Sequence, residues 1–519
     1  MAREPMQRAT FFLAVCCMLA AARAGLAQQP AEEPTFDILE YRVEGNSVLP
    51  KLAIERAVYP HLGEKKRIAD VEKARVALEK AYRDAGYATV VVNVPQQKVD
   101  KGVVVLQVIE GRIERVRVTG SRYYSQGSIL ERVGAAGPNE VPYFPEVQKQ
   151  IDRLNTADRR VTPVLRPGTA PGTTEIELRV SDQLPLHGSL ELNNRYSPGT
   201  EPLRLTAGLH YDNMFQRDHV FGLQYQTSPQ DWSQVKAALA TYAIPLSDGN
   251  VYGYYVSSNS NVAAVGGVTV LGKGRIAGLR RSWYLPGGAG FSHSLTAGVD
   301  YKNFDQVSPI LETPVHYLPF SIDYSGNTQG TSGTTQFSLA TVFSVRGLGN
   351  NPDDFAKARF GANPNFFILR WDIQRNQNLP WWGLALVARF DGQLADQPLI
   401  NNEQYFAGGL MNVRGYLESE ALGDRAVHGS LELRGPNISG NSEWMQELRA
   451  IAFTEGAQLR VVDPLPEQQQ RFTLSSTGMG LRARASNIEL WLNYAVAIKS
   501  TLYTQAHHGR TQFSAVFRF

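Results

Sequence analysis

One stretch of the chain has the spacing of a phosphate-binding loop. Gly267, Gly272 and Lys273 stand at fixed positions of that motif, whose backbone N–H groups hold phosphates at the start of a helix. Gly274 occupies the position where a Ser or Thr hydroxyl would bind magnesium. Residues 275–279 alternate as a strand does, so no helix follows. We therefore predict that this stretch binds no nucleotide.

No other residues form a recognisable catalytic or metal-binding set. The nine histidines include no pair at the helical spacing of metal ligands, and His507-His508 fits a solvated loop better than a surface metal site. No Gly-x-Ser-x-Gly nucleophile motif occurs. Basic and acidic residues nearly balance, 52 against 49, which argues against a nucleic-acid partner. The sequence thus predicts no enzyme, with no catalytic residue, no metal and no cofactor.

Residues 1–27 have the pattern of a secretory signal peptide. Two arginines precede the apolar run 9–22, which is shorter than the ~20 residues needed to span a bilayer. Small residues follow, and we predict cleavage after Ala27. Cleavage removes both cysteines of the chain. Residues 28–35 are then a short linker.

Helical and strand patterns alternate from residue 36 to residue 183. The clearest helix covers 69–85, with apolar residues at spacings of three and four (Val71, Ala74, Leu78, Ala81 and Ala85). Strands are predicted around this helix at 36–44, 88–94 and 102–110. The order recurs with strands at 113–118, 159–165 and 174–180 and helices around 128–133 and from Pro145. We predict two consecutive β-α-α-β-β modules, 36–111 and 112–183.

Helical periods end near residue 183, and a two-residue alternation continues to the C-terminus. Counting apolar and polar alternation over segments of about ten residues predicts sixteen strands within 184–519. The predicted starts are near Leu186, Leu203, Asp218, Val235, Asn250, Lys273, Phe291, Val315, Thr334, Phe366, Leu384, Ala426, Leu448, Ser475, Ile488 and Thr511. An even number allows an antiparallel sheet to close with both ends on one side.

A soluble sandwich would alternate as well, but three features favour a transmembrane β-barrel. The apolar faces end in aromatic residues, as at Tyr211, Tyr225 and Phe519, which suits a membrane interface. The segments have the length of a tilted spanning strand. The opposite faces carry charges that a dry core would not tolerate unpaired, namely Arg195, Arg204, Lys236, Arg370, Arg389, Arg434, Arg482 and Arg484. Sixteen strands enclose a lumen too wide for wall side chains to fill, so it is a channel or holds a plug.

The longest predicted connection, residues 395–425, joins strands eleven and twelve. Such connections are usually functional or disordered, and this one is not polar enough for simple disorder. It contains Val413, Arg414, Gly415 and Tyr416 in succession. This quartet matches the VRGY loop motif of the two-partner secretion transporters (TpsB-type haemolysin/haemagglutinin secretion and activation proteins), and the chain resembles that family. The resemblance implies that the loop folds back into the barrel.

A second match lies in the thirteenth predicted strand. In the family, the inner wall of this strand carries a Phe-x-Asp-x-Gly pattern whose acid contacts the loop arginine. Here Phe453 and Glu455 share one face of the strand, with Glu in place of Asp and Ala457 in place of the second Gly. The resemblance implies that Glu455 pairs with Arg414, as an arginine in a wide lumen requires a carboxylate. The longer Glu side chain leaves the geometry of the pair open, and an exposed loop arginine is the alternative.

The resemblance covers nearly the whole mature chain. Both modules resemble POTRA domains, with Gly45-Asn46 and Gly120-Ser121 after the first strand of each. The terminal Phe519 resembles the C-terminal aromatic by which barrel-assembly machinery recognises outer-membrane proteins. Many relatives have a plug helix before the first POTRA domain, but residues 28–35 include two prolines and are too short for one.

The resemblance implies a monomeric pore in outer-membrane lipid with its POTRA domains in the periplasm. It implies translocation of a large secreted partner, an adhesin or haemolysin, without ATP and with the POTRA domains docking the unfolded client. One alternative is an assembly factor of the same superfamily that inserts other barrels, although its members usually carry more than two POTRA modules. A passive porin or receptor is another, although a porin does not need such modules.

Overall fold

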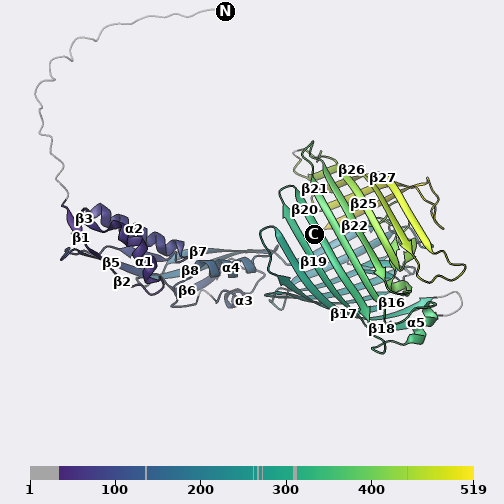
Figure 1. Cartoon of the computed structure of the whole chain (residues 1–519), viewed down its shortest axis with the longest axis horizontal. Coiled ribbons are helices and arrows are strands. Elements are labelled where there is room, and N and C mark those ends of the chain that lie inside the picture. The colour runs from purple at the N-terminus through teal and green to yellow at the C-terminus, as the bar shows by residue number, and fades with distance from the viewer. Residues whose placement is uncertain are drawn as a thin grey trace, which may run out of the picture. The chain divides into compact units, whose positions relative to one another are not determined.

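The computed structural model describes residues 34–134, 137–260, 262–265, 268–271, 273–307, 312–440 and 442–519. The predicted signal peptide, 1–27, lies outside the described residues. The chain forms two compact units (Figure 1). The first unit contains the chain up to Arg122 and Gln126–Asp182, and the second contains Tyr123–Ser125 and Gln183–Phe519.

The first half of the first unit is an α+β module built on a three-stranded sheet in the order β2-β5-β4. Strand β2 is parallel to β5, and β4 is antiparallel to it. The elements are β1 (Phe36–Ile38), β2 (Glu40–Glu44), α1 (Lys51–Val58), η1 (Tyr59–His61), β3 (Gly63–Lys66), α2 (Ile68–Asp84), β4 (Val90–Asn93) and β5 (Val103–Glu110). The single strand predicted over 36–44 is thus two strands, and β1 pairs with β3 instead of the main sheet.

The buried face of α2 differs slightly from the predicted one. Val71, Ala74 and Leu78 are buried as the spacing predicts, whereas Ala81 is only partly buried. Tyr82 is fully buried in its place, and its hydroxyl donates to Asn46 Oδ1 at 2.6 Å. A buried tyrosine fits here because Asn46, in the turn after β2, satisfies its polar end.

The second half of the first unit repeats this arrangement, as the recurring sequence pattern predicts. Its sheet has the order β6-β8-β7, with β6 parallel and β7 antiparallel to β8. The elements are β6 (Arg112–Thr119), α3 (Gln126–Glu131), α4 (Phe144–Leu154), β7 (Arg159–Pro167) and β8 (Thr173–Asp182). Helix α4 covers the sheet with Val147, Ile151 and Leu154, all of them buried.

The turn between β7 and β8 is held by one carboxylate, Glu114 of β6. It accepts hydrogen bonds from the Thr169 hydroxyl, the Thr173 hydroxyl at 2.8 Å and the Thr169 backbone N–H at 2.7 Å. These hydrogen bonds, that of the Thr169 hydroxyl first, lower the pKa of Glu114 to about 2. Hydrogen bonds stabilise the ionised form because each donor points at the charged oxygens.

We expect the first unit to lose stability in acid partly through Glu114. Its pKa is depressed on folding, so its contribution is complete above the unfolded value of about 4.3 and is lost as pH falls to about 2. In calorimetry of the full-length protein, the unfolding temperature of the first unit should fall as the pH is lowered from about 4.3 to about 2, and Glu114→Gln should make this fall smaller. Glu64→Gln, which removes an exposed carboxylate of the other module, should not. Equal slopes for the two variants would contradict the role of Glu114.

The second unit is a closed antiparallel barrel of sixteen strands within the described residues. Its strands are β9 (Leu186–Asn193), β10 (Arg204–Met214), β11 (His219–Thr227), β12 (Lys236–Leu246), β13 (Gly249–Ser258), β16 (Lys273–Leu285), β17 (Phe291–Val307), β18 with β19 (Glu312–Tyr317 and Pro319–Gly330), β20 (Gly333–Ser344), β21 (Phe367–Asn378), β22 (Ala385–Ala395), β25 (Arg425–Arg434), β26 (Met445–Arg460), β27 (Arg471–Ala485), β28 (Ile488–Ala497) and β29 (Gly509–Arg518). Strands β18 and β19 count as one because both pair with β17 on either side of Leu318. The predicted strand number is confirmed.

The barrel closes by pairing its last strand with its first. Residues Ser514 to Arg518 of β29 pair with Asn193 to Ser189 of β9. Phe519 extends this seam, because its N–H donates to Gly188 O at 3.0 Å and its carbonyl accepts from Gly188 N at 2.8 Å. Closure removes the unpaired strand edges that a sandwich would leave, so the sandwich alternative is wrong.

Alternating side chains face opposite sides of the barrel wall, as the sequence pattern predicts. The outward positions are large apolar side chains that remain exposed, for example Leu190, Leu223 and Leu490, and they suit contact with lipid. Lys236 departs from its predicted inward placement. Lys236 is the first residue of β12 and is exposed. Its side chain lies on the opposite face of the strand from that of Ala237, which is buried in the core inside the barrel.

No helix within the described ranges is both long enough and apolar enough to cross a membrane.

Candidate functional site

The long connection between β22 and β25, strands eleven and twelve, is packed inside the barrel. It carries η3 (Asn401–Glu403), β23 (Tyr405–Ala407) and β24 (Ala421–Gly423), and β23 pairs with β24. Val413 and Tyr416 are fully buried, and Arg414 is 5% exposed. Burial of a charged side chain requires partners of opposite charge, and Arg414 is the charged residue at the centre of the site.

Glu455, on the inner face of β26, binds Arg414 with both carboxylate oxygens. Arg414 Nε and Nη2 donate to Glu455 Oε1 at 2.9 and 2.5 Å, and the Arg414 backbone N–H donates to Oε2 at 2.8 Å. Both guanidinium donors therefore share one oxygen, and the other oxygen holds the loop backbone. The carboxylate fixes both the side chain and the main chain of the loop.

The aromatic ring of Phe453 lies beneath the same guanidinium. Arg414 Cζ is 3.4 Å from the ring centroid, a cation–π contact made in a buried site, where such contacts are strongest. Gly478, the register partner of Phe453 on β27, leaves the space for this ring. A Cβ at Gly478 would lie 2.5 Å from Phe453 Cζ.

The other three residues of the motif attach the loop to the wall. Val413 lies in an apolar cluster with residues of the loop and of β25–β28. Gly415 has φ +91°, a conformation that favours glycine, and its N–H donates to Gln512 Oε1 of β29 at 2.9 Å. The Tyr416 hydroxyl is 2.7 Å from Lys499 O and 3.0 Å from Ser475 O. The quartet thus contacts the wall from β25 to β29.

A second carboxylate partner, Glu432 of β25, was not found from the sequence. Its Oε2 accepts from Arg414 Nη1 at 2.9 Å, and its Oε1 accepts from Arg434 at 2.8 Å and Arg482 at 3.1 Å. Glu432 is 4% exposed. The only sequence signal was its inward position among charged residues. We call Arg414, Glu455 and Glu432 the tip cluster.

We expect Glu432→Gln to destabilise the folded barrel by roughly 3 kcal/mol, because it leaves the buried Arg414 and the partly buried Arg434 and Arg482 short of a carboxylate. The measurement is the temperature at which the compact, heat-modifiable band disappears in semi-native electrophoresis. Glu447→Gln on β26 is the matched control, since the Glu447–Arg449 pair is about one-third exposed on both sides and should contribute little. Loss of the compact band at the same temperature in both variants would contradict a structural role for Glu432.

A second polar network that the sequence did not reveal lies beside the tip cluster. His428 of β25 contacts Asp391 Oδ1 through Nδ1 at 2.7 Å and the carbonyl of Asn412 through Nε2 at 3.1 Å. The Tyr405 hydroxyl donates to the other oxygen of Asp391 at 2.5 Å. Asp391, on the wall strand β22, therefore holds the loop through the Tyr405 hydroxyl and contacts His428 on the neighbouring wall strand β25.

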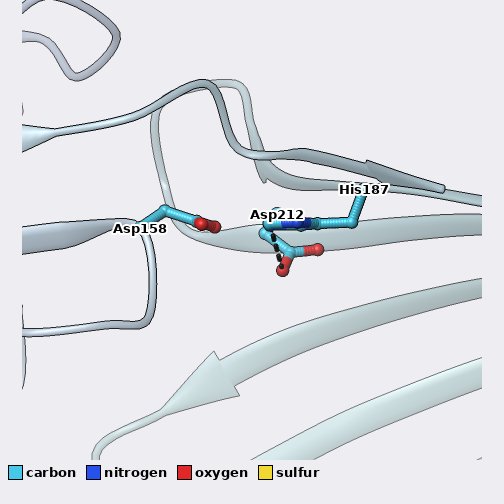
Figure 2. A group of neighbouring side chains, drawn as sticks. All are labelled: Asp158, His187 and Asp212. Atoms are coloured by element: carbon cyan, nitrogen blue, oxygen red, sulfur yellow. Dashed lines mark ion pairs between the residues drawn. The ribbon is translucent and has the colours of Figure 1, made fainter. Parts of the chain in front are cut away.

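Near the start of the barrel, His187 of β9 and Asp212 of β10 face each other, with His187 Nε2 3.9 Å from Asp212 Oδ2 (Figure 2). Asp158, also drawn in Figure 2, belongs to the first unit. Within the barrel unit, Asp212 is also bound by His210 Nδ1 at 2.6 Å. His187 and His210 are register partners with ring centroids 4.9 Å apart, and we assign the three barrel side chains to contacts between the adjacent strands β9 and β10.

Two family profiles match the chain. A POTRA domain of the ShlB type matches residues 36–111, and the haemolysin secretion/activation protein family ShlB/FhaC/HecB matches residues 172–482. The outer membrane transporter CdiB of Dickeya dadantii is 21% identical over 78% of this chain and 74% of its own length. CdiB of Escherichia coli strain 536 is 24% identical over 35% of this chain and 31% of its own.

Solved structures share the fold. CdiB from Escherichia coli superposes with a TM-score of 0.62 at 16% identity, covering 96% of this chain and 93% of the other. BamA from Haemophilus ducreyi lacking POTRA domains 1–3 superposes with a TM-score of 0.57 at 14% identity, covering 93% of this chain and 100% of the other.

Proposed function

Because the chain belongs to the haemolysin secretion/activation protein family, an outer-membrane transporter family of two-partner secretion, we propose that it carries one large secreted partner from periplasm to cell surface. The barrel lies in the outer membrane and the POTRA domains in the periplasm. The partner would be an adhesin or haemolysin that arrives unfolded.

The observation that carries this proposal is a buried arginine, Arg414, inside a barrel of sixteen strands. A barrel of this size has room for a polypeptide only if the loop that occupies it can move. The tip cluster holds the loop by discrete ion pairs that can exchange for water. We propose that the client displaces the loop and passes along the wall that it leaves.

We propose that the POTRA domains dock the unfolded client by strand addition. In the first module, β2 and β4 are the outer strands of the order β2-β5-β4, so each has an edge without a partner in that sheet. An extended peptide can add to such an edge through main-chain hydrogen bonds. Leu39, beside β2, is 69% exposed and offers apolar contact to the added chain.

No nucleotide hydrolysis is needed in this mechanism. A client that folds at the surface buries apolar area, and this free energy opposes its return through the pore. The barrel-assembly machinery would be a partner only during biogenesis, when it inserts the barrel itself.

The proposal is tested by expressing the chain together with a candidate partner, a large repetitive exported protein from the same cell. Protease should reach that protein on intact cells when the chain is present. Without the chain, the exported protein should stay in the periplasm. Surface display that does not depend on the chain would overturn the proposal.

The alternative is an assembly factor that inserts other barrels, which the fold shared with BamA suggests. Deleting the gene separates the two functions. An assembly factor would be needed for normal levels of many outer-membrane proteins, whereas a transporter would be needed only for its partner. A general fall in porin levels would favour the assembly factor.

A further inference from the structure

A second outer connection also packs against the inner face of the barrel wall, and no sequence pattern predicted it. This α5 segment, residues 345–366, joins β20 to β21 and contains α5 (Pro352–Ala358). Phe355, Ala362 and Phe366 are at most 3% exposed and share a core with residues of the inner wall. An outer loop with solvent on all sides would not bury these side chains, so this segment is packed on the inner face of the wall.

The α5 segment and the long loop share this core. Leu399 and Ile400, at the start of the long loop, belong to the same cluster as Phe355. Gln397 Nε2 donates to Asn363 O at 2.8 Å. The ring of Phe355 packs against Tyr317 of the wall, with centroids 5.4 Å apart. The two segments therefore form one packed body at the outer end of the barrel.

Arg359, immediately after α5, joins the α5 segment to the long loop and to the connection between β26 and β27. Its Nη2 donates to Asp424 Oδ2 at 2.7 Å and to Val462 O at 3.2 Å, and its Nη1 donates to Asp424 Oδ1 at 2.5 Å and to Leu399 O. The two parallel bonds to Asp424 form a fork, the strongest arrangement for an arginine and a carboxylate. Asp424 is completely buried.

Asp424 and Glu403 hold the two ends of the long loop. Asp424 also accepts from the N–H groups of Leu399 and Val462 at 3.0 and 2.7 Å. Glu403, 1% exposed, contacts Lys302 Nζ at 2.5 Å and the Tyr317 hydroxyl at 2.7 Å. We call Glu403, Asp424 and Arg359 the base cluster. It binds a different part of the wall from the tip cluster.

We propose that the α5 segment is a second gate, and that Arg359 is the residue that positions it against the long loop. Release of the tip cluster frees the middle of the loop, but both ends remain held beneath the α5 segment. The pore therefore opens fully only when the base cluster also separates. This inference rests on the proposed transport function, because it specifies how the loop is displaced.

The first test measures single-channel conductance in planar bilayers and needs no client. We expect Arg414→Ala alone to leave the pore mostly closed. The double variant Arg414→Ala with Arg359→Gln should populate the open state at least about tenfold more than Arg414→Ala, because it removes a second buried fork from the closed state. Arg346→Gln replaces an exposed arginine of the same segment and is the control. Equal open populations in the double variant and Arg414→Ala would overturn the proposal, provided that both show the heat-modifiable band.

The second test locks the segment in place. Cys16 and Cys17 are the only cysteines in the chain, so Asn363→Cys with Gln397→Cys introduces a unique pair in the barrel. A reducible thiol cross-linker across this pair should block secretion of the co-expressed partner at least about tenfold, and reduction should restore it. Secretion through the cross-linked barrel would overturn the second gate. Failure of the unmodified chain to secrete the partner would instead refute the proposed function, and the conductance comparison would still decide the gate.

Discussion

Arg414→Ala is expected to abolish secretion of the partner while the barrel still inserts into the outer membrane. The substitution removes the three hydrogen bonds that the Arg414 side chain donates to Glu455 and Glu432. Glu455, 7% exposed, loses its arginine, whereas Glu432, 4% exposed, keeps Arg434 and Arg482. Breaking a buried pair in this way costs about 3–5 kcal/mol. The middle of the loop is then no longer fixed to β25 and β26, although the base cluster still holds both ends. The client therefore no longer meets the loop in the position from which we propose that it is displaced.

The measurement compares the partner on intact cells with the partner retained in the periplasm. Arg414→Lys keeps the charge but not the fork of donors, so we expect it to recover only part of the secretion. Arg460→Ala, which removes an exposed arginine from the same strand as Glu455, should secrete normally. Normal secretion by Arg414→Ala, with the heat-modifiable band intact, would refute the role proposed for the loop.

Deletion of Phe519 is expected to cause the second large effect, a loss of folded barrel. The seam between β29 and β9 has five register pairs, against eight between β9 and β10. Phe519 adds two backbone hydrogen bonds to Gly188, and its ring stacks on Phe517 with centroids 5.8 Å apart. A short seam depends heavily on such terminal contacts because each barrel has only one place to close.

The folded fraction is measured as the heat-modifiable band in membranes and, separately, after refolding in detergent. Loss in membranes with normal refolding in detergent would assign Phe519 to recognition by the assembly machinery. Loss in both would assign it to the seam. Phe519→Tyr retains an aromatic ring and both backbone hydrogen bonds to Gly188 and should fold normally. If the deletion variant accumulates to normal levels in membranes, neither role holds.

The strand number and the two faces of the wall were predictable because each depends on local alternation. A strand of a barrel has lipid on one side and the lumen on the other, so every second residue is apolar whatever its neighbours are. The predicted starts at Leu186, Phe291 and Ile488 coincide with the first residues of β9, β17 and β28. Lys236 is the exception because a residue at the first position of a strand, at the rim, need not face either environment.

Which charges pair across the barrel was not predictable in the same way. Glu455 was identified by a family motif, whereas Glu432, whose Oε2 is 2.9 Å from Arg414 Nη1, belongs to no such motif. The partners of Arg359 are 40, 65 and 103 residues away along the chain. Such contacts depend on the stagger of sixteen strands around a closed circle, and alternation along one strand carries no information about that stagger.

The sequence by itself therefore determined the architecture, the loop that carries Arg414 and the family to which the chain belongs. These properties depend on local period and on one short motif. Only the tertiary structure decided that the α5 segment lies inside the barrel and that Arg359 joins it to Asp424. The physical reason is that a short amphipathic helix in a long connection suits a surface as well as a lumen, and only closure of the barrel supplies the apolar wall that Phe355 needs.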